Sequence, residues 1–270
     1  MKRPYLLPSF LLLLASAPCW AVEPLDTFSV RVGGYITDFD TKVRADGQTG
    51  QGTRIDLNRD LGLDNNNAIG VIALSWRPWE KHEFGLSWYR DSADAERNTE
   101  RDIDFNGQHY ATHTRIRAKF DLDAYEGYYT WWAWGDGRWA LGPRVGLIWY
   151  QMDLDLSATA DVNGNPINAR AGNDVNADLP APTIGGSWRW APGEHWRLSA
   201  DAGYFSASLN DVDADVTFGR GGVEYFPWDN WGFSLDYTVR RIEADVDASR
   251  LDGNLRFVDS GVRVGVIYRF

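Results

Sequence analysis

Four histidines are the side chains of this sequence best suited to acid–base or metal chemistry. His82 and His195 fall in short polar turns, while His109 and His113 flank the tip of a longer connection. On a strand, residues four apart are separated by about 13 Å, too far for both imidazoles to bind one metal ion. No motif in the sequence places a histidine beside a nucleophile. A Ser-His-Asp site can still form from residues far apart in the sequence, because folding brings them together. We therefore expect no enzyme, and a hydrolase that uses His109 and His113 is the least favoured alternative.

The composition argues against several classes of function. The formal net charge of −11, from 27 Lys and Arg against 38 Asp and Glu, argues against nucleic acid as a partner. Cys19 is the single cysteine, so a fold stapled by disulfides is excluded. Residues 1–21 have the charge, apolar stretch and small residues of a signal peptide, which leaves residues 22–270 as one domain.

Short polar turns and longer polar connections alternate along the rest of the chain. The short turns are residues 78–82, 135–137, 191–194 and 227–230. The longer connections are residues 46–67, 161–178 and 249–254, with further tips near 106–107 and 210. Because each connection separates two runs of alternating residues, the pattern predicts an all-β chain of about ten antiparallel strands, with eight or twelve as alternatives.

Side chains in these runs alternate between an apolar and a polar face. In the last run Phe270 and Tyr268 share one face, while Arg269 and Arg263 lie on the other. A soluble barrel has apolar residues inside, whereas unbroken apolar faces backed by Arg and Asp are typical of a barrel embedded in lipid. Pro143 interrupts one such run, so we expect a local bulge there.

A terminal strand of this kind, ending in an aromatic residue, resembles the closing strand of bacterial outer-membrane β-barrels. The resemblance implies a transmembrane antiparallel up-and-down β-barrel in the outer membrane of a Gram-negative bacterium, with both termini periplasmic. It also implies contact with lipid and lipopolysaccharide, and recognition of Tyr268 and Phe270 by the outer-membrane assembly machinery. Two enzyme families of this class, the omptins and the lipid A deacylases, use Asp-x-His and His-x-Ser arrangements, and neither occurs here.

Tryptophans gather beside the four short turns. Amphipathic rings prefer the headgroup level of a bilayer, so we expect an aromatic girdle at the periplasmic rim. Trp132 belongs to the same group of rim residues. The predicted girdle consists of Trp76, Trp79, Trp134, Trp139, Trp190, Trp196, Trp228 and Trp231.

Farther along each strand the pattern inverts, with acidic outward and apolar inward positions. Strands of about 20 residues would reach beyond a bilayer core, so we expect the barrel to extend above the membrane. The outward acids are either only solvated or share divalent cations with lipopolysaccharide; no other cofactor is expected. The inward residues either pack together or line a chamber for a hydrophobic molecule. The predicted ligand-binding residues of this upper lumen are Phe105, Phe120, Leu122, Leu154, Val216, Phe218 and Val246.

Within the membrane the inward positions carry both signs of charge. A ten-stranded barrel is narrow, and unpaired buried charges are costly, so long side chains should cross the lumen and pair. This favours a closed lumen over a narrow path for small solutes. The predicted lumen charge network consists of Arg31, Arg77, Glu126, Arg144, Arg189, Arg197, Asp201, Arg220, Glu224, Asp236 and Arg240.

Two functions follow from these expectations. The leading one is a non-enzymatic outer-membrane barrel that binds or passes a small molecule, a hydrophobic one if the upper lumen is a chamber. The alternative is a closed structural or interaction barrel that stabilises the envelope or presents its extracellular loops.

Overall fold

Long strands form most of the structure, a computed structural model that describes residues 22–46, 55–56, 60, 68–98, 103–105, 108–110, 115–162, 165–167, 173–209, 212–248 and 251–270. The signal peptide predicted for residues 1–21 lies outside this part of the chain. Within the described ranges no helix is long and apolar enough to cross a membrane. The long strands are β1 (Phe28–Asp46), β3 (Ala68–Trp79), β4 (His82–Asn98), β7 (Arg115–Trp131), β9 (Trp139–Val162), β11 (Asn173–Trp190), β12 (Trp196–Leu209), β13 (Val212–Tyr225), β14 (Trp231–Ala248) and β15 (Leu251–Arg269). The short strands are β2 (Ile55–Asp56), β5 (Ile103–Phe105), β6 (Gln108–Tyr110), β8 (Trp134–Gly135) and β10 (Asn165–Ile167).

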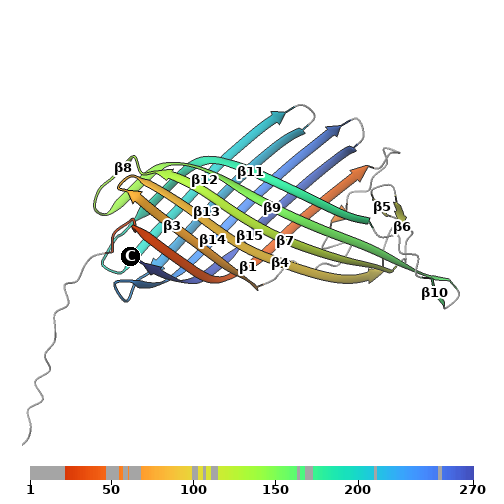
Figure 1. Ribbon diagram of the computed structural model, residues 1–270, viewed down its shortest axis with the longest axis horizontal. Coiled ribbons are helices and arrows are strands. Elements are labelled where there is room, and N and C mark those ends of the chain that lie inside the picture. Colours follow the sequence, from red (N-terminus) through yellow and green to blue (C-terminus); the bar gives the residue numbers. More distant parts are fainter. Residues whose placement is uncertain are drawn as a thin grey trace, which may run out of the picture.

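The ten long strands close into a barrel (Figure 1). Each pairs in antiparallel fashion with its neighbours in chain order, from β1 through β3, β4, β7, β9, β11, β12, β13 and β14 to β15. The ring closes because β15 pairs with β1 along its length. The predicted up-and-down barrel of ten strands is therefore confirmed.

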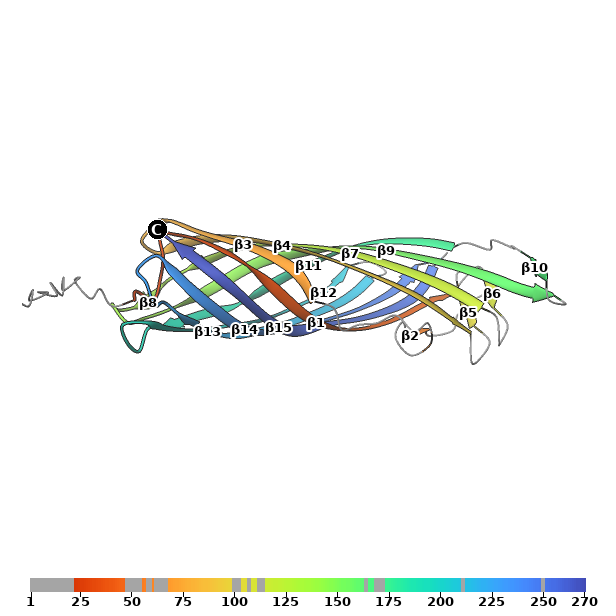
Figure 2. The ribbon, with the colours of Figure 1, turned by 90° about the horizontal axis from the view of Figure 1, so that it is seen from below.

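The two ends of the barrel differ in their connections. The turn end holds the short connections and the C-terminus, where the Phe270 N–H donates to the Phe28 carbonyl at 2.9 Å. The loop end holds β2, β5, β6 and β10 (Figure 2). The connections predicted at residues 161–178 and 249–254 were too long, because β11 already begins at Asn173 and β15 at Leu251. Polar residues continue these strands since the barrel extends beyond its apolar belt.

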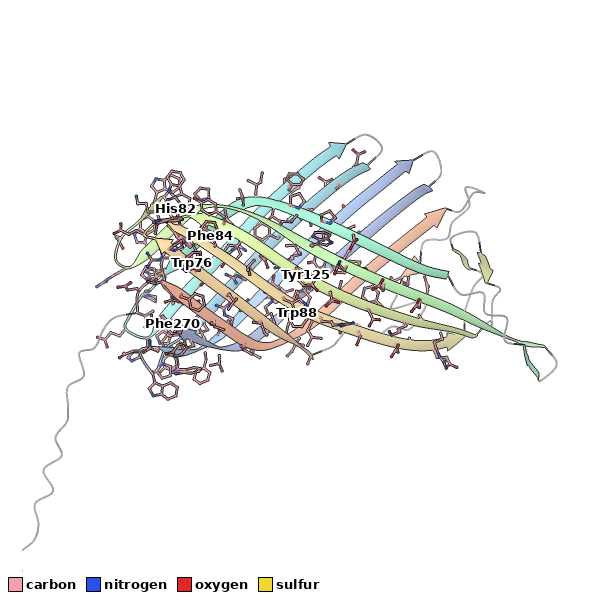
Figure 3. The ribbon with its side chains drawn as sticks, in the orientation of Figure 1. Trp76, His82, Phe84, Trp88, Tyr125 and Phe270 are labelled. Carbon is pink, nitrogen blue, oxygen red and sulfur yellow. The ribbon has the colours of Figure 1, made fainter. Side chains whose placement is uncertain are left out.

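The outer surface carries an apolar belt between two groups of aromatic residues. Trp76, Phe84 and Phe270 lie near the turn end, and Trp88 and Tyr125 lie farther along the barrel (Figure 3). Belt side chains such as those on the middle of β3, β9 and β14 are exposed on the outside. The exposed belt residues are Val32, Ile36, Ile72, Leu74, Leu86, Leu141, Val145, Leu147, Ile184, Phe233, Leu235, Val239, Val264 and Val266.

Toward the loop end the barrel wall separates into two groups of strands. β11 pairs with β12 only from Ile184 to Trp190, and β3 pairs with β4 only from Val71 onward. One group is β4, β7, β9 and β11, and the other is β12, β13, β14, β15 and β1; their ends point in different directions in Figure 1. Pro180 and Pro182 lie on β11 just above the last pair with β12. Proline lacks the N–H that a ladder needs, so these residues fit the open edge of a strand.

The bulge expected at Pro143 lies on the neighbouring segment instead. Pro143 keeps regular register with Gly186 of β11. On its other side Thr130 pairs with Arg144 and Trp134 pairs with Leu141, so three residues face two. The extra residue, between β7 and β8, absorbs the irregularity that proline imposes.

The turn between β8 and β9 is fixed by one carboxylate. Asp136 Oδ1 accepts the backbone N–H of Arg138 at 2.7 Å and that of Trp139 at 3.2 Å. The hydrogen bond from the Arg138 N–H lowers the pKa of the Asp136 carboxyl. The aspartate thus orders the turn in its charged form.

Two adjacent glycines on β11 give a test of how closely the strands approach. A Cβ at Gly185 would overlap the Ala202 carbonyl oxygen of β12, whereas one at Gly186 would meet its nearest atom at 3.7 Å. We expect Gly185→Ala to lower the free energy of unfolding by about 1–3 kcal/mol, because the short β11–β12 ladder must shift. Gly186→Ala is the matched control and should be nearly neutral. Urea titration followed by tryptophan fluorescence measures both, and equal stabilities would contradict the close approach.

Candidate functional site in the barrel lumen

The lumen holds a column of paired charges whose centre is Asp201 of β12. This carboxylate is buried and lies 2.8 Å from Arg189, 2.5 Å from Arg220 and 3.8 Å from Arg144. The arginines come from β11, β13 and β9, so one acid ties together side chains of three other strands. We call these four residues the Asp201 cluster.

Glu126 of β7 extends the column toward the loop end. Its carboxylate pairs with Arg144 at 2.7 Å and, on the other oxygen, with Arg240 of β14. β7 and β14 lie on opposite sides of the ring of strands. These pairs therefore cross the lumen, as the inward charges of the sequence predict.

Glu224 of β13 extends the column toward the turn end. It pairs with Arg31 of β1 and with Arg197 of β12, the latter at 2.6 Å. Arg31 also lies 3.5 Å from Asp236, and Arg197 lies 2.8 Å from Asp26. Asp26 precedes β1, so the chain before the first strand belongs to the same column.

That N-terminal segment covers the turn end of the lumen. Val22 is buried in a cluster with Ala191, Phe226 and Ile267. The Val22 N–H donates to the Glu194 carbonyl at 3.2 Å. Nothing in the alternation of the strands indicated this role, because the segment precedes the first alternating run.

Arg77 was wrongly predicted to join the charge network. Its guanidinium donates to the backbone carbonyls of Asp26 at 3.1 Å, Glu80 at 3.0 Å and Leu25 at 3.5 Å. Arg77 lies where the ladder between β3 and β4 is irregular, from Trp76 to Trp79, and it meets the N-terminal segment at the turn end of the lumen. It holds the N-terminal segment in place instead of pairing with a carboxylate.

A second buried cluster, missed from the sequence, surrounds Asp259 of β15. The hydroxyls of Tyr35, Tyr89 and Tyr150 all donate to this carboxylate, the last two at 2.5 and 3.1 Å. Arg240 lies 3.5 Å away and connects the cluster to Glu126. We call the aspartate and the three tyrosines the Asp259 cluster; alternation places all four inward but does not show that they meet.

Above the Asp259 cluster the lumen is filled by apolar side chains. The outward neighbours on the same strands, such as Asp94, Asp155 and Asp213, are exposed acids, so the inverted pattern is present. Four of the residues predicted for the upper lumen are buried in this apolar cluster, namely Phe120, Leu122, Leu154 and Val216. Phe218 is also buried, but it lines the charged cavity, where the Arg144 guanidinium lies 5.9 Å from its ring. The ligand-binding role of these residues stays a prediction.

The other two predicted upper-lumen residues are placed differently. Phe105 belongs to β5, which pairs with β6 in a separate two-stranded sheet, so it is not on a barrel strand. Val246 lies on β14, and its side chain is outside the described part, as are those of Phe105 and His109. His113 itself falls outside the described residues.

The predicted girdle residues lie on the outer surface near the turn end. Trp139 is half-buried and the other seven are exposed. Trp132 was wrongly grouped with these rim residues, because it is buried and donates its indole N–H to Glu83 at 3.1 Å. Its inward position continues the alternation of β7, in which Thr130 is also buried and Trp131 is exposed.

A second girdle lies at the other edge of the apolar belt. Trp88 donates to Asp123 at 3.4 Å and Trp149 donates to Asp178 at 3.3 Å. Tyr204 donates to Asp215 at 2.6 Å. Each exposed ring thus has an apolar belt on one side and an acid on the other, as at a membrane interface.

Comparisons with known proteins support the fold. No family model and no curated protein matches the sequence. The outer-membrane protease OmpT from Escherichia coli aligns with a TM-score of 0.61 at 12% identity, over 92% of this chain and 97% of that chain. Neisserial surface protein A gives 0.32 at 12% identity over 90% and 97%, and the Pseudomonas putida toluene transporter TodX gives 0.35 at 10% over 91% and 90%. At such identities the likeness extends to the fold and not to activity. In its fold the chain is similar to bacterial outer-membrane β-barrels, as its last strand predicts.

Proposed function

We propose that the protein is a closed outer-membrane barrel with a structural or interaction role, and not a pore. The turn end would face the periplasm and the loop end the exterior of a Gram-negative cell. The observation that carries this proposal is the column of ion pairs that crosses the lumen from Asp26 to Asp259. The cavity within it amounts to about 80 Å³, which is room for a few waters.

The outer surface supports the membrane placement. The apolar belt and its two girdles match a bilayer core with its interfaces. Phe270 is exposed beside Phe28, with ring centroids 5.5 Å apart, where assembly machinery could reach the last strand. Among the described residues no group of three His, Cys, Asp or Glu is arranged to hold a metal ion. Sharing of divalent cations between single outward acids and lipopolysaccharide stays a prediction.

Conductance in a planar bilayer tests the closed lumen. We expect the refolded wild-type barrel to give no current steps, because Arg144 and Arg240 cross the lumen to Glu126. A variant with Arg144, Arg240 and Glu126 all replaced by Ser removes this layer and should give steps if it folds. An open porin serves as the insertion control. Steady ohmic steps from the wild type would overturn the proposal and make Arg144, Asp201 and Asp236 candidates for ion selectivity.

A second candidate is binding of a small hydrophobic molecule in the upper lumen. The observation that favours it is the separation of β11 from β12, where Leu179 and Phe205 are only partly buried against the apolar core. Partly exposed apolar side chains beside the unpaired edges of β11 and β12 would let a hydrophobic molecule enter the upper lumen from the side. Saturable binding of an uncharged aromatic probe that is lost in Phe205→Ser would favour this candidate, and its absence would leave the closed barrel alone.

A further inference from the structure

The lumen cavity has more hydrogen-bond donors than acceptors. Its lining includes seven arginines and five carboxylates, and two further buried carboxylates, Asp236 and Asp259, pair with the lining residues Arg31 and Arg240. Seven buried guanidinium nitrogens, from Arg31, Arg144, Arg240 and Arg263, have no hydrogen-bond partner among the described protein atoms. The unpartnered carboxylate oxygens are the two of Asp236, one of which lies 3.5 Å from Arg31. Donors in the rest of the cavity therefore outnumber the acceptors available to them.

Arg263 of β15 is the least compensated of these cations. It is 6% exposed, and no carboxylate of the described residues pairs with it. Its guanidinium lies over the Tyr35 ring at 4.6 Å and faces the Tyr89 ring at 5.8 Å. Stacking uses the face of the guanidinium and leaves its N–H edge available to an acceptor.

Arg144 repeats this arrangement. It is 4% exposed and stacks on the Tyr128 ring at 3.6 Å. Its Nη2 pairs with Glu126 at 2.7 Å and its Nη1 lies 3.8 Å from Asp201, but Nε and Nη1 make no hydrogen bond within the described residues. Arg240, also 4% exposed, shares Glu126 and has its Nη1 3.5 Å from Asp259, and its Nε and Nη1 likewise make no hydrogen bond there. All three arginines line the same cavity.

We propose that this cavity binds a small inorganic anion of the halide class, held by the N–H edges of Arg144, Arg240 and Arg263. Buried cations without enough acceptors are costly, and one monovalent anion would satisfy several donors at once. The volume of about 80 Å³ suits a halide with a few waters and excludes a large organic anion. The inference goes beyond the closed-barrel proposal, because the anion is detected by its effect on Tm. That effect does not depend on whether the barrel conducts ions.

Thermal unfolding in sodium chloride against sodium gluconate at matched concentrations tests the site. A ligand that binds only the folded state raises Tm with its concentration, so each tenfold increase in chloride above the Kd should raise Tm by about 3–6 °C. Arg263→Lys keeps the charge but lacks the guanidinium edge and should lose this dependence. Arg241→Met, which changes an exposed arginine of β14, should keep it. Equal melting in both salts, or equal dependence in Arg263→Lys, would overturn the proposal.

Anomalous diffraction from wild-type crystals grown in bromide gives a test that needs no variant. A bromide peak within hydrogen-bonding reach of Arg263 is expected. Peaks confined to the outer surface, or water alone in the cavity, would overturn the site even if a variant failed to fold.

Discussion

Asp201→Ala is expected to lower the free energy of unfolding by about 3–5 kcal/mol, the cost of leaving buried charges without their partner. The Asp201 carboxylate is buried among Arg144, Arg189 and Arg220. Arg144 keeps Glu126, but no other carboxylate of the described residues pairs with Arg189 or Arg220. Urea unfolding of the refolded barrel, followed by tryptophan fluorescence, measures the loss.

Two further variants separate the cluster from a general effect of lost charge. Asp213→Asn removes an exposed carboxylate one strand away and should change stability by less than about 0.5 kcal/mol. Adding Arg220→Met to Asp201→Ala removes one of the stranded cations and should recover part of the loss. If Asp201→Ala unfolds like Asp213→Asn, the Asp201 cluster does not hold the lumen together.

The direction of most side chains could be predicted from the sequence. Period-two alternation follows from strand geometry, so it placed Asp201, Glu126 and Arg240 inside and the belt outside. It did not show what the inward side chains meet near the turn end. Arg77 donates to the backbone of the N-terminal segment, and the Trp132 indole donates to Glu83.

The partners of the inward charges could not be predicted in the same way. Which residues meet across a barrel depends on strand tilt and shear, and these are properties of the closed ring. Asp259 and Tyr150 are separated by 109 positions, and no spacing brings them together. The role of the N-terminal segment was missed because this segment is not a strand, so its side chains show no alternation.

The division of the loop end into two groups of strands makes the Asp259 cluster the second site where a large effect is expected. Asp259 and Tyr35 come from β15 and β1, whereas Tyr89 and Tyr150 come from β4 and β9. Where the β11–β12 ladder has ended, these hydrogen bonds join the two groups directly. A hydrogen bond to a charged group contributes about 1.5–3 kcal/mol, so Tyr89→Phe should lower stability by that amount.

Asp259→Asn should cost more than Tyr89→Phe, since it weakens three hydroxyl contacts and removes the charge beside Arg240. Local opening of the loop end would accompany it, because the cluster is a polar contact between the groups. We therefore expect faster amide hydrogen exchange in residues 173–183 and 205–209, with little change in the paired residues 184–190. Tyr237→Phe, on the outer face of β14, is the control and should leave both stability and exchange unchanged. Uniform acceleration along β11 would instead mean that Asp259 supports the whole barrel and does not specifically fasten its upper section.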